Sequence, residues 1–256
     1  KTYNYVRHLV KNNNISTYIE PFAGGAAVAL RLLINNDVKR IIINDYDRSI
    51  YALWYSIINH PNELINKILE TEITIEEWHK QREVQKEKQK ANLLDLGFST
   101  LFLNRTNRSG IIKAGVIGGL KQEGKYKIDC RFNKETIINR IKKIALHADK
   151  IKVCNYDAID FIEKEIKFTR NSLTFFDPPY YDKGPDLYTN YYSHDDHVKL
   201  AQAISQLMRN RYWILTYDTA IEIKNIYKKY KYYPIKYYLN YSISKPTRGQ
   251  EFMFFS

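Results

Sequence analysis

Short apolar runs alternate with amphipathic stretches at both ends of this chain. ISTYIEPF (15–22) is a β-leaning run, GGAAVALRLLI (24–34) has a helical pattern, and RIIIND (40–45) predicts a second strand. The alternation returns at KIKVCNYDAIDFIEK (150–164), a strand and then a helix. Apolar strands that alternate with helices in this order indicate a parallel α/β sheet.

The same pattern continues to the C-terminal residue. SLTFFDPPYY (172–181) predicts a strand, and the next helix, strand and helix are expected in HDDHVKLAQAISQLMRN, YWILTY and TAIEIKNIYKKY. YYPIKYYLNYSI (232–243) and EFMFFS (251–256) predict a final antiparallel hairpin. Alternating tyrosines favour a half-buried sheet here over a base-stacking platform. Lys245, Arg248 and the turn around Gly249 remain candidates for phosphate contacts.

The middle of the chain, from about residue 62 to 149, is mainly helical in pattern and highly charged. The segment 75–104 predicts one long helix or a helix pair, and KETIINRIKKIALHA (134–148) predicts an amphipathic helix. Gly-Gly and Glu-Gly between β-leaning flanks at 116–129 indicate a hairpin or an ordered loop. We therefore expect an α/β domain (1–60 and 150–256) interrupted by a helical domain (61–149).

Composition and charge limit the functional classes. Hydrophobic residues make up 44% of the 256 residues, yet no apolar run approaches 20 residues, so no membrane span is expected. The N-terminal segment does not resemble a signal peptide, and without an initiator Met we expect native residues before Lys1. The net charge of +12 favours a nucleic-acid partner, although an AT-rich coding bias explains part of it.

The two cysteines, Cys130 and Cys154, stand alone. Without a CxxC or Cys/His cluster they indicate neither a disulfide scaffold nor a zinc site, so we expect two small buried thiols in a reducing cytoplasm. No metal is expected.

Polar groups follow the predicted strands at their carboxyl ends, where open α/β sheets bind ligands. The Gly24-Gly25 turn lacks the GxGxxG and P-loop patterns, so it suits a nucleoside ligand without a pyrophosphate, or only tight packing. Asp45, about 20 residues later, suits ribose hydroxyls or a helix N-cap near Ser49. Tyr156 and Asp157 follow the third strand; either could border an adenine, and Asp157 could equally cap a helix.

The fourth strand ends in Asp177-Pro178-Pro179-Tyr180. Each proline fixes φ and removes an N–H, and Asp177 is biased to an extended conformation because it precedes Pro178. The result is a stiff turn that presents a carboxylate, carbonyls and an aromatic ring to a planar amine. A turn that merely ends the strand is the alternative.

Taken together, these segments resemble the Dam-type family of adenine-N6 DNA methyltransferases. The resemblance rests on EPFAGG, Asn-Asp closing the next strand, FLNRTNRSG, DPPYYDKGPDLYTNYYSHDDH and RGQEFMFFS, in the family's order over nearly the whole chain. It implies a Rossmann-like methyltransferase domain with a mostly parallel sheet and a C-terminal antiparallel hairpin, plus an inserted, mainly helical target-recognition domain. A monomer or weak dimer is expected.

The resemblance implies S-adenosyl-L-methionine as the cofactor, S-adenosyl-L-homocysteine as its product, and no metal. Family members begin with a Gly-Gly-Lys-like segment; Lys1 matches its Lys, and the glycines before it are not in this chain. The implied cofactor-binding residues are Lys1, Glu20, Pro21, Phe22, Ala23, Gly24, Gly25, Asp45, Tyr156, Asp157 and Asp177.

The implied catalytic residues are Asp177, Pro178, Pro179 and Tyr180. The Asp177 carboxylate and the Pro178 carbonyl would each accept one N6–H of adenine, which localises the nitrogen lone pair and stabilises its growing positive charge. Tyr180 would stack on a base flipped out of duplex DNA.

The inserted domain is the natural place for DNA target recognition. Its polar, basic candidates for phosphate and base contacts are Asn104, Arg105, Arg108, Ser109 and Lys113. Dam proteins that recognise GATC have an aromatic–Asn pair at Arg108-Ser109 and an Arg near Lys113, so that target is not transferred to this chain.

Three alternatives remain open from the sequence: an RNA adenine methyltransferase, a cytosine-N4 methyltransferase, and a non-catalytic DNA-binding protein on a methyltransferase scaffold. Asp177 argues against cytosine-N4 transfer, which usually carries Ser before Pro-Pro. The expected partners are double-stranded DNA and, in a restriction–modification system, a cognate endonuclease, in a prokaryotic or phage-infected cytoplasm.

Overall fold

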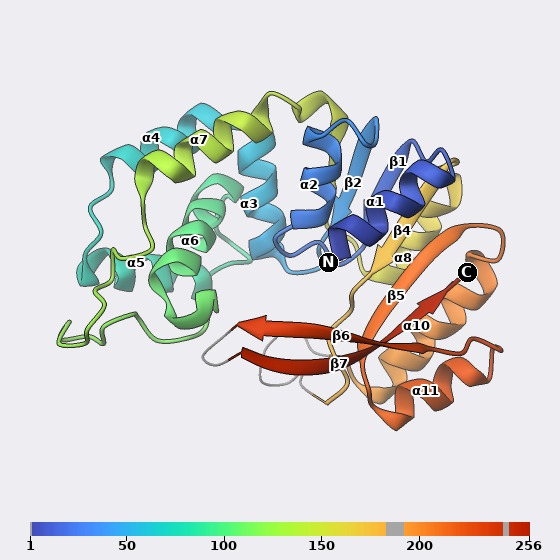
Figure 1. The fold of residues 1–256 in the computed structure, drawn as a ribbon. Helices are drawn as coiled ribbons and strands as arrows, with labels where there is room; N and C mark the ends of the chain where they lie inside the picture. The colour runs from blue at the N-terminus through green and yellow to red at the C-terminus, as the bar shows by residue number, and fades with distance from the viewer. Residues whose placement is uncertain (1, 183–191, 243–245) are drawn as a thin grey trace. The chain divides into compact units, whose positions relative to one another are not determined.

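The chain forms two compact units in the computed structural model, which describes residues 2–182, 192–242 and 246–256, with side chains outside 239–248. The first unit comprises residues 1–46 and 154–256, and the second comprises residues 47–153 (Figure 1). The sequence analysis placed these boundaries at residues 60 and 150. The first boundary lies earlier because the helix at 48–59 packs within the second unit, against the helix at 93–106.

The described strands form a seven-stranded sheet with the order β3-β2-β1-β4-β5-β7-β6, which contains all strands of the first unit and β3 at the boundary between the units. β1 is parallel to β2 and β4, β4 is parallel to β5, and β7 is antiparallel to both β5 and β6. This confirms the predicted mostly parallel α/β sheet with an antiparallel C-terminal hairpin. The strands are β1 (Thr17–Glu20), β2 (Arg40–Asn44), β3 (Ile151–Cys154), β4 (Ser172–Phe176), β5 (Tyr212–Asp218), β6 (Ile235–Ser242) and β7 (Pro246–Phe255).

Helices lie on both faces of this sheet. The helices of the first unit are α1 (Thr2–Asn12), α2 (Ala27–Ile34), α8 (Ala158–Lys164), η3 (Ile166–Phe168), α10 (His194–Leu207) and α11 (Ile221–Lys228). The sequence analysis did not anticipate α1, because only two of its side chains, Val6 and Val10, are fully apolar and buried. The Tyr5 ring of this helix packs edge-on against Phe255 of β7, with centroids 6.1 Å apart.

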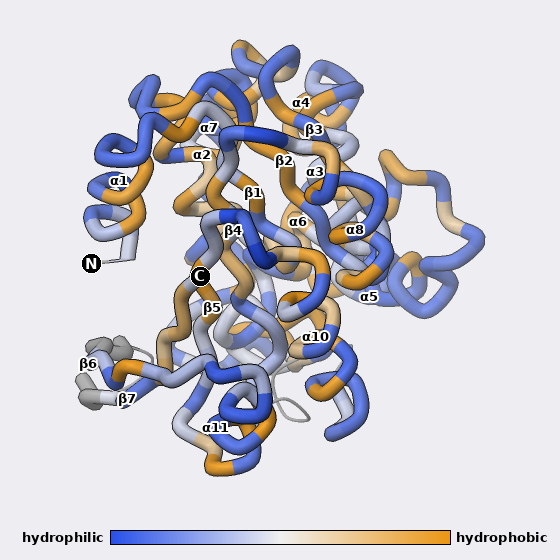
Figure 2. Tube along the Cα trace, turned by 90° about the vertical axis from the view of Figure 1, so that its right-hand side faces the viewer, coloured by the Kyte–Doolittle hydropathy of each residue, from blue (hydrophilic) through white to orange (hydrophobic). Residues whose placement is uncertain are grey.

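One hydrophobic core joins α8, α10 and α11 to one face of the sheet. Phe161, Leu200 and Ile223 from these helices contact a cluster that includes Ile19 of β1 and Leu215 of β5. β2 is hydrophobic along its middle in Figure 2, where Ile41, Ile42 and Ile43 are all buried, as expected for a strand covered on both faces. Because side chains alternate along a strand, the residues adjacent to these core positions point to the opposite face.

That opposite face is polar at the carboxyl ends of the strands. It carries Glu20 next to Ile19, and Thr216 and Asp218 on either side of Tyr217. α2 lies on this face, because the backbone N–H of its Ala29 donates to Glu20 Oε1 over 3.2 Å. Glu20, Thr216 and Asp218 are therefore buried polar groups that share one face of the sheet near the carboxyl ends of its strands.

The second unit is helical. Its elements are α3 (Arg48–Asn59), α4 (Pro61–Glu70), α5 (Ile75–Lys86), α6 (Leu93–Thr106), η1 (Arg108–Gly110), α7 (Lys134–Ala145) and η2 (Ala148–Lys150). The predicted segment 75–104 is thus a helix pair. Gly97 permits the close packing of α3 on α6, since a Cβ at this position would lie 2.6 Å from the Ala52 carbonyl oxygen.

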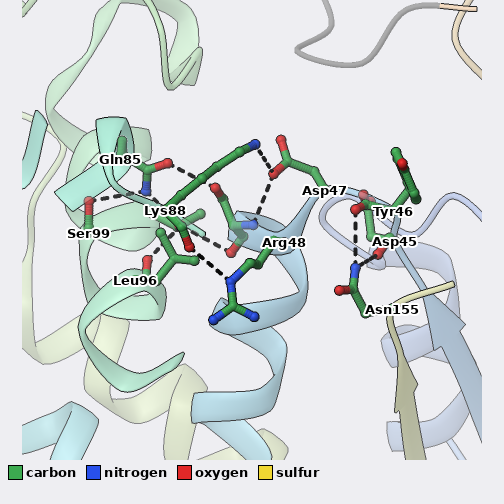
Figure 3. A network of polar contacts seen from close by, with 11 residues as sticks. Asp45, Tyr46, Asp47, Arg48, Gln85, Lys88, Leu96, Ser99 and Asn155 are labelled. Atoms are coloured by element: carbon green, nitrogen blue, oxygen red, sulfur yellow. Dashed lines mark hydrogen bonds and ion pairs between the residues drawn. The ribbon is translucent and has the colours of Figure 1, made fainter. Parts of the chain in front are cut away.

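A polar network holds the start of α3 to the α5–α6 connection (Figure 3). The Arg48 guanidinium donates to the carbonyls of Lys88 and Ala91 over 2.9 and 3.0 Å, and Lys88 Nζ forms an ion pair with Asp47 at 3.0 Å. Asp47 also accepts the backbone N–H of Ser49, so Asp47 is the N-cap of α3. The alternative in which Asp45 caps this helix is wrong.

The structure settles two further expectations, on residues 116–129 and on the two cysteines. Residues 116–129 form an ordered loop without a hairpin; Gln122 supports it by donating to the Ile117 and Gly119 carbonyls. Cys154 is buried as predicted, whereas Cys130 is exposed because it lies in the polar turn before α7. Within the described ranges, no helix is long and apolar enough to cross a membrane.

Candidate active site

The Gly24-Gly25 turn opens the candidate site at the carboxyl end of β1. Gly24 adopts φ +45°, and no protein atom lies within 4 Å of a Cβ built at Gly24 or Gly25. The Gly24 N–H donates to Asp45 Oδ2 over 2.9 Å. Two sequence-predicted parts of the cofactor pocket therefore lie in direct contact, beside an exposed and unobstructed stretch of backbone.

The neighbouring residues of this turn are held by β2. The Ala23 N–H donates to the Asn44 carbonyl over 2.9 Å, and the Asn44 amide donates to the Pro21 carbonyl over 2.9 Å. Pro21 and Ala23 are buried, and the half-buried Phe22 ring packs edge-on against Tyr192, with centroids 5.9 Å apart. The turn is therefore held in place by hydrogen bonds to β2, while Gly24 and Gly25 remain exposed.

Asn44 and Asn155 join the ends of β2 and β3. Asn44 exchanges two hydrogen bonds with the backbone of Tyr156, at 3.0 and 2.8 Å. Asn155 donates to the carbonyls of Asp45 and Tyr46 over 2.7 and 3.1 Å, as Figure 3 shows. These amides place Tyr156 near Asp45, as a single nucleoside pocket requires, although the sequence analysis assigned neither Asn a role.

Tyr156 and Asp157 differ in their surroundings. Tyr156 is half-buried, with the Lys164 ammonium 4.9 Å from its ring centroid. Asp157 is exposed and accepts the Ile159 N–H over 2.9 Å, which confirms its interpretation as the N-cap of α8. Its carboxylate thus has a structural function whether or not it also borders a ligand.

Asp177 lies at the carboxyl end of β4, beside β5. Its Oδ1 accepts a hydrogen bond from Thr216 Oγ1 over 2.7 Å. Desolvation by the surrounding protein raises the pKa of Asp177 to about 6; the Thr216 hydrogen bond opposes this rise and the Glu251 charge adds to it. Asp177 nevertheless retains access to solvent, whereas Pro178 and Pro179 are buried. The carboxylate is therefore accessible to a substrate on a firmly packed turn.

Glu20 is a second acidic group on this face and is almost fully buried, with 6% of its surface exposed. Burial raises the pKa of Glu20 to about 8, and the charge of Asp177 contributes to the rise. The Ala29 N–H, its donor at the start of α2, lowers the pKa. At neutral pH Glu20 therefore carries a proton, and Asp177 is the ionised member of the pair.

Tyr180 projects toward β7. Its hydroxyl donates to Glu251 over 2.7 Å, and Tyr237 of β6 donates to the other oxygen of the same carboxylate. Burial and the nearby carboxylates raise the pKa of Tyr180 well above its usual value, so it stays a neutral donor. Asp218 accepts the backbone N–H groups of Tyr181 and Asp182 over 3.2 and 2.8 Å.

The structure therefore brings most of the predicted catalytic and cofactor-binding residues to the carboxyl ends of β1, β2, β3 and β4. Lys1 lies outside the described residues, as does Lys245, and the Arg248 side chain is not described. Thr216, Asp218 and Glu251 also belong to this cluster and were not predicted from the sequence. Two features of the sequence could have identified them: Thr216 and Asp218 stand at alternate positions of an apolar strand, and Glu251 directly precedes the apolar run 252–255.

The predicted DNA-binding residues occupy the end of α6 and the following loop in the second unit. Arg108, Ser109 and Lys113 are exposed, and Ser109 adopts φ +56°. The Asn104 amide donates to the Gly110 carbonyl over 2.9 Å, so its side chain stabilises the loop. Burial and the charges of Arg131 and Arg140 lower the pKa of Arg105, the fifth candidate.

Asn107, which the sequence analysis did not single out, organises this loop. Trp78 Nε1 donates to Asn107 Oδ1 over 2.6 Å, and the Asn107 amide donates to the carbonyls of Ile111 and Ile112 over 3.1 and 2.8 Å. The exposed basic side chains are therefore displayed on a loop with a buried polar anchor.

Comparison with known proteins places these features in a family context. A family model described as D12 class N6 adenine-specific DNA methyltransferase matches residues 2–240. The type II methyltransferase M.MjaIII of Methanocaldococcus jannaschii is 27% identical over 215 residues, which cover 77% of this chain and 72% of the relative. The type II methyltransferase M.CviBI of Paramecium bursaria Chlorella virus NC1A is 26% identical over 198 residues, covering 74% and 68%.

Proposed function

Because the chain belongs to the D12 class of N6 adenine-specific DNA methyltransferases, we propose that its sheet edge binds S-adenosyl-L-methionine beside a flipped-out adenine of duplex DNA. Family membership decides for adenine-N6 transfer to DNA over the RNA, cytosine-N4 and non-catalytic alternatives. The observation that carries the proposal is the position of Asp177, at the end of β4 and next in the sheet to the β1 turn that contacts Asp45.

The pocket residues fit the cofactor. Gly24 and Gly25 leave open space above the backbone, which allows a nucleoside to approach closely. Asp45, at the tip of β2, is in the position where sheets of this kind hold ribose hydroxyls. Tyr156 supplies a half-buried aromatic surface for the adenine of the cofactor. Glu20, Pro21, Phe22 and Ala23 shape the floor of the same pocket.

The bound cofactor would supply an electrophilic methyl group: the N6–C bond forms, the C–S bond breaks with its electron pair left on sulfur, and one proton leaves N6. Asp177 and the Pro178 carbonyl accept the two N6–H groups of the target base. Because the Asp177 pKa is about 6, the carboxylate is mostly ionised at neutral pH and can stabilise positive charge on N6. The same carboxylate would then accept the departing proton. The stiff Pro178-Pro179 turn keeps both acceptors in place.

The second unit would provide target recognition, with Arg108, Ser109 and Lys113 as its exposed candidates and Arg105 behind them. The type II methyltransferases among its relatives suggest a restriction–modification system with a cognate endonuclease. Such an enzyme would act on DNA in a prokaryotic or phage-infected cytoplasm.

Expression in a host without DNA methylation tests the proposal. Single-molecule sequencing of the host genome should reveal N6-methyladenine at one recurring sequence, and the Asp177→Ala variant should leave the genome unmodified. An unmodified genome in cells that contain folded wild-type protein would contradict the proposed function.

A further inference from the structure

Glu251 is an unusual residue for its position. It lies on β7 with only 2% of its surface exposed and is followed by buried Phe252, Met253 and Phe254. A carboxylate in such surroundings is costly unless hydrogen-bond donors surround it. The groups that donate hydrogen bonds to the Glu251 carboxylate therefore indicate what this residue does.

The pairing of the strands sets Glu251 in a polar row. Glu251 is directly opposite Asp218 of β5 on one side and Tyr237 of β6 on the other. Opposite residues of antiparallel strands point to the same face, and two carboxylates so placed repel each other. The fold must therefore provide donors for both acids.

Most of those donors come from the segment that follows Pro179. Glu251 accepts the hydroxyl of Tyr180 over 2.7 Å, and Asp218 accepts the N–H groups of Tyr181 and Asp182. The Tyr237 hydroxyl donates to the other oxygen of the Glu251 carboxylate. The two acids thus hold three consecutive residues, beginning with the tyrosine of the Asp-Pro-Pro-Tyr turn.

We propose that Glu251 is a positioning residue for base binding: its carboxylate fixes the orientation of the Tyr180 ring, while Asp218 fixes the backbone that follows. The inference rests on the proposed function, in which Tyr180 stacks on the flipped adenine. A phenol that donates to a buried acceptor loses freedom to rotate, so the ring is already oriented when the base arrives.

Glu251 also affects the electrostatics of the reacting groups. Thr216 on β5, Glu251 on β7 and Tyr180 on its own turn act on Asp177. The charge of Asp177 in turn raises the pKa values of Glu20 and Tyr18 on β1. Because the Glu251 charge raises the pKa of Asp177, removing that charge should lower it. The acidic limb of kcat/KM would then move to lower pH.

Steady-state methyl transfer to an adenine-containing duplex tests the proposal in four proteins: wild type, Glu251→Gln, Tyr180→Phe and the double variant. Each single change should lower kcat/KM for DNA about fivefold to tenfold, as the weakening or loss of one ordinary hydrogen bond implies, with unchanged affinity for the cofactor. The double variant should be no more impaired than the more impaired of the two single variants, because Glu251→Gln weakens and Tyr180→Phe removes the same hydrogen bond. Gln250→Ala, an exposed neighbour on β7, should match wild type.

Three results would overturn the inference: an unaffected Glu251→Gln variant, losses that multiply in the double variant, or an unshifted acidic limb in Glu251→Gln. If Glu251→Gln does not fold, Tyr180→Phe alone tests the proposal, because this variant keeps the ring and removes only the hydroxyl. Full activity of Tyr180→Phe would exclude a positioning function for Glu251. An inactive wild-type protein would instead overturn the proposed function itself.

Discussion

Thr216 Oγ1 donates a hydrogen bond to Asp177 Oδ1 over 2.7 Å, from β5 to the end of the adjacent strand β4. This contact favours the ionised form of a carboxylate whose pKa is otherwise raised by desolvation. It also fixes the position of Oδ1 of the carboxylate. Asp177 is therefore held in the charge state and orientation that acceptance of an amine N–H requires.

Replacement of Asp177 by Ala should abolish methyl transfer. Removal of one charge-stabilising group from an active site typically lowers kcat by about 10²–10³. The affinity for S-adenosylmethionine should fall much less, because the glycine turn and Asp45 remain. Transfer of a radiolabelled methyl group and calorimetric titration measure the two effects. Near-normal turnover on adenine-containing DNA would rule out the proposed role of Asp177.

The pH dependence of activity should identify Asp177 as the titrating group. With a pKa of about 6 in the free enzyme, kcat/KM should decline about tenfold per unit below pH 6. Thr216→Val removes a hydrogen bond that lowers the Asp177 pKa, so its acidic limb should move to higher pH. Thr216→Ser retains the hydroxyl and serves as the control. If the pH profiles of Thr216→Val and wild type coincide, a group other than Asp177 is responsible for the acidic limb.

Tyr180 should contribute mainly through its ring. Tyr180→Ala removes base stacking worth roughly 1–3 kcal/mol, which corresponds to a decrease of about 5- to 150-fold in kcat/KM for DNA. Tyr180→Phe keeps the ring and loses only the bond to Glu251, so its effect should be several-fold. Steady-state kinetics with both variants make the comparison, and an inactive Phe variant would argue against stacking.

Particular residues show what the sequence could and could not predict. Asp177, Gly24 and Asp45 were predictable because strand ends in a parallel sheet meet at one edge. Glu251 was not, because its function depends on the register in which β7 pairs with β5 and β6, which brings residues distant in sequence into one row. Pairing between strands that are distant in the chain produces no recognisable pattern in the local sequence.

The helices show the same limit. The capping function of Asp157 follows from local sequence, whereas the choice of Asp47 over Asp45 for α3 depends on where the backbone turns. Cys130 was predicted to be buried from its residue type alone, but the polar turn around it determines its exposure. The conformational preferences of residues therefore predict local features such as helix caps better than they predict whether a side chain is buried or exposed.

Buried Glu20 should make the protein less stable as pH rises. The folded pKa of about 8 lies above the usual value of 4.5, so between these values the folded state keeps a proton that the unfolded state has lost. The free energy of unfolding should therefore fall with increasing pH in this window, by at most about 1.4 kcal/mol per unit. Urea unfolding between pH 5 and 8 measures the slope.

Glu20→Gln should flatten this slope, because a neutral amide can still accept the Ala29 N–H without titrating. Glu163→Gln, an exposed substitution on α8, provides the control and should keep the wild-type slope. Equal slopes in Glu20→Gln and wild type would show that Glu20 does not retain its proton.

The exposed cations of the α6 loop should bind DNA. Arg108→Ala should weaken binding to all sequences and reduce the slope of log K against log salt by about 0.9 if Arg108 contacts a phosphate. If it contacts a base edge, the variant should instead lose discrimination at one position, by roughly 1–3 kcal/mol. Fluorescence anisotropy at several salt concentrations distinguishes the two. Lys143→Ala removes an exposed charge from α7 of the same unit and should have little effect. An Arg108→Ala variant that binds DNA like Lys143→Ala at every salt concentration would exclude this loop residue from the interface.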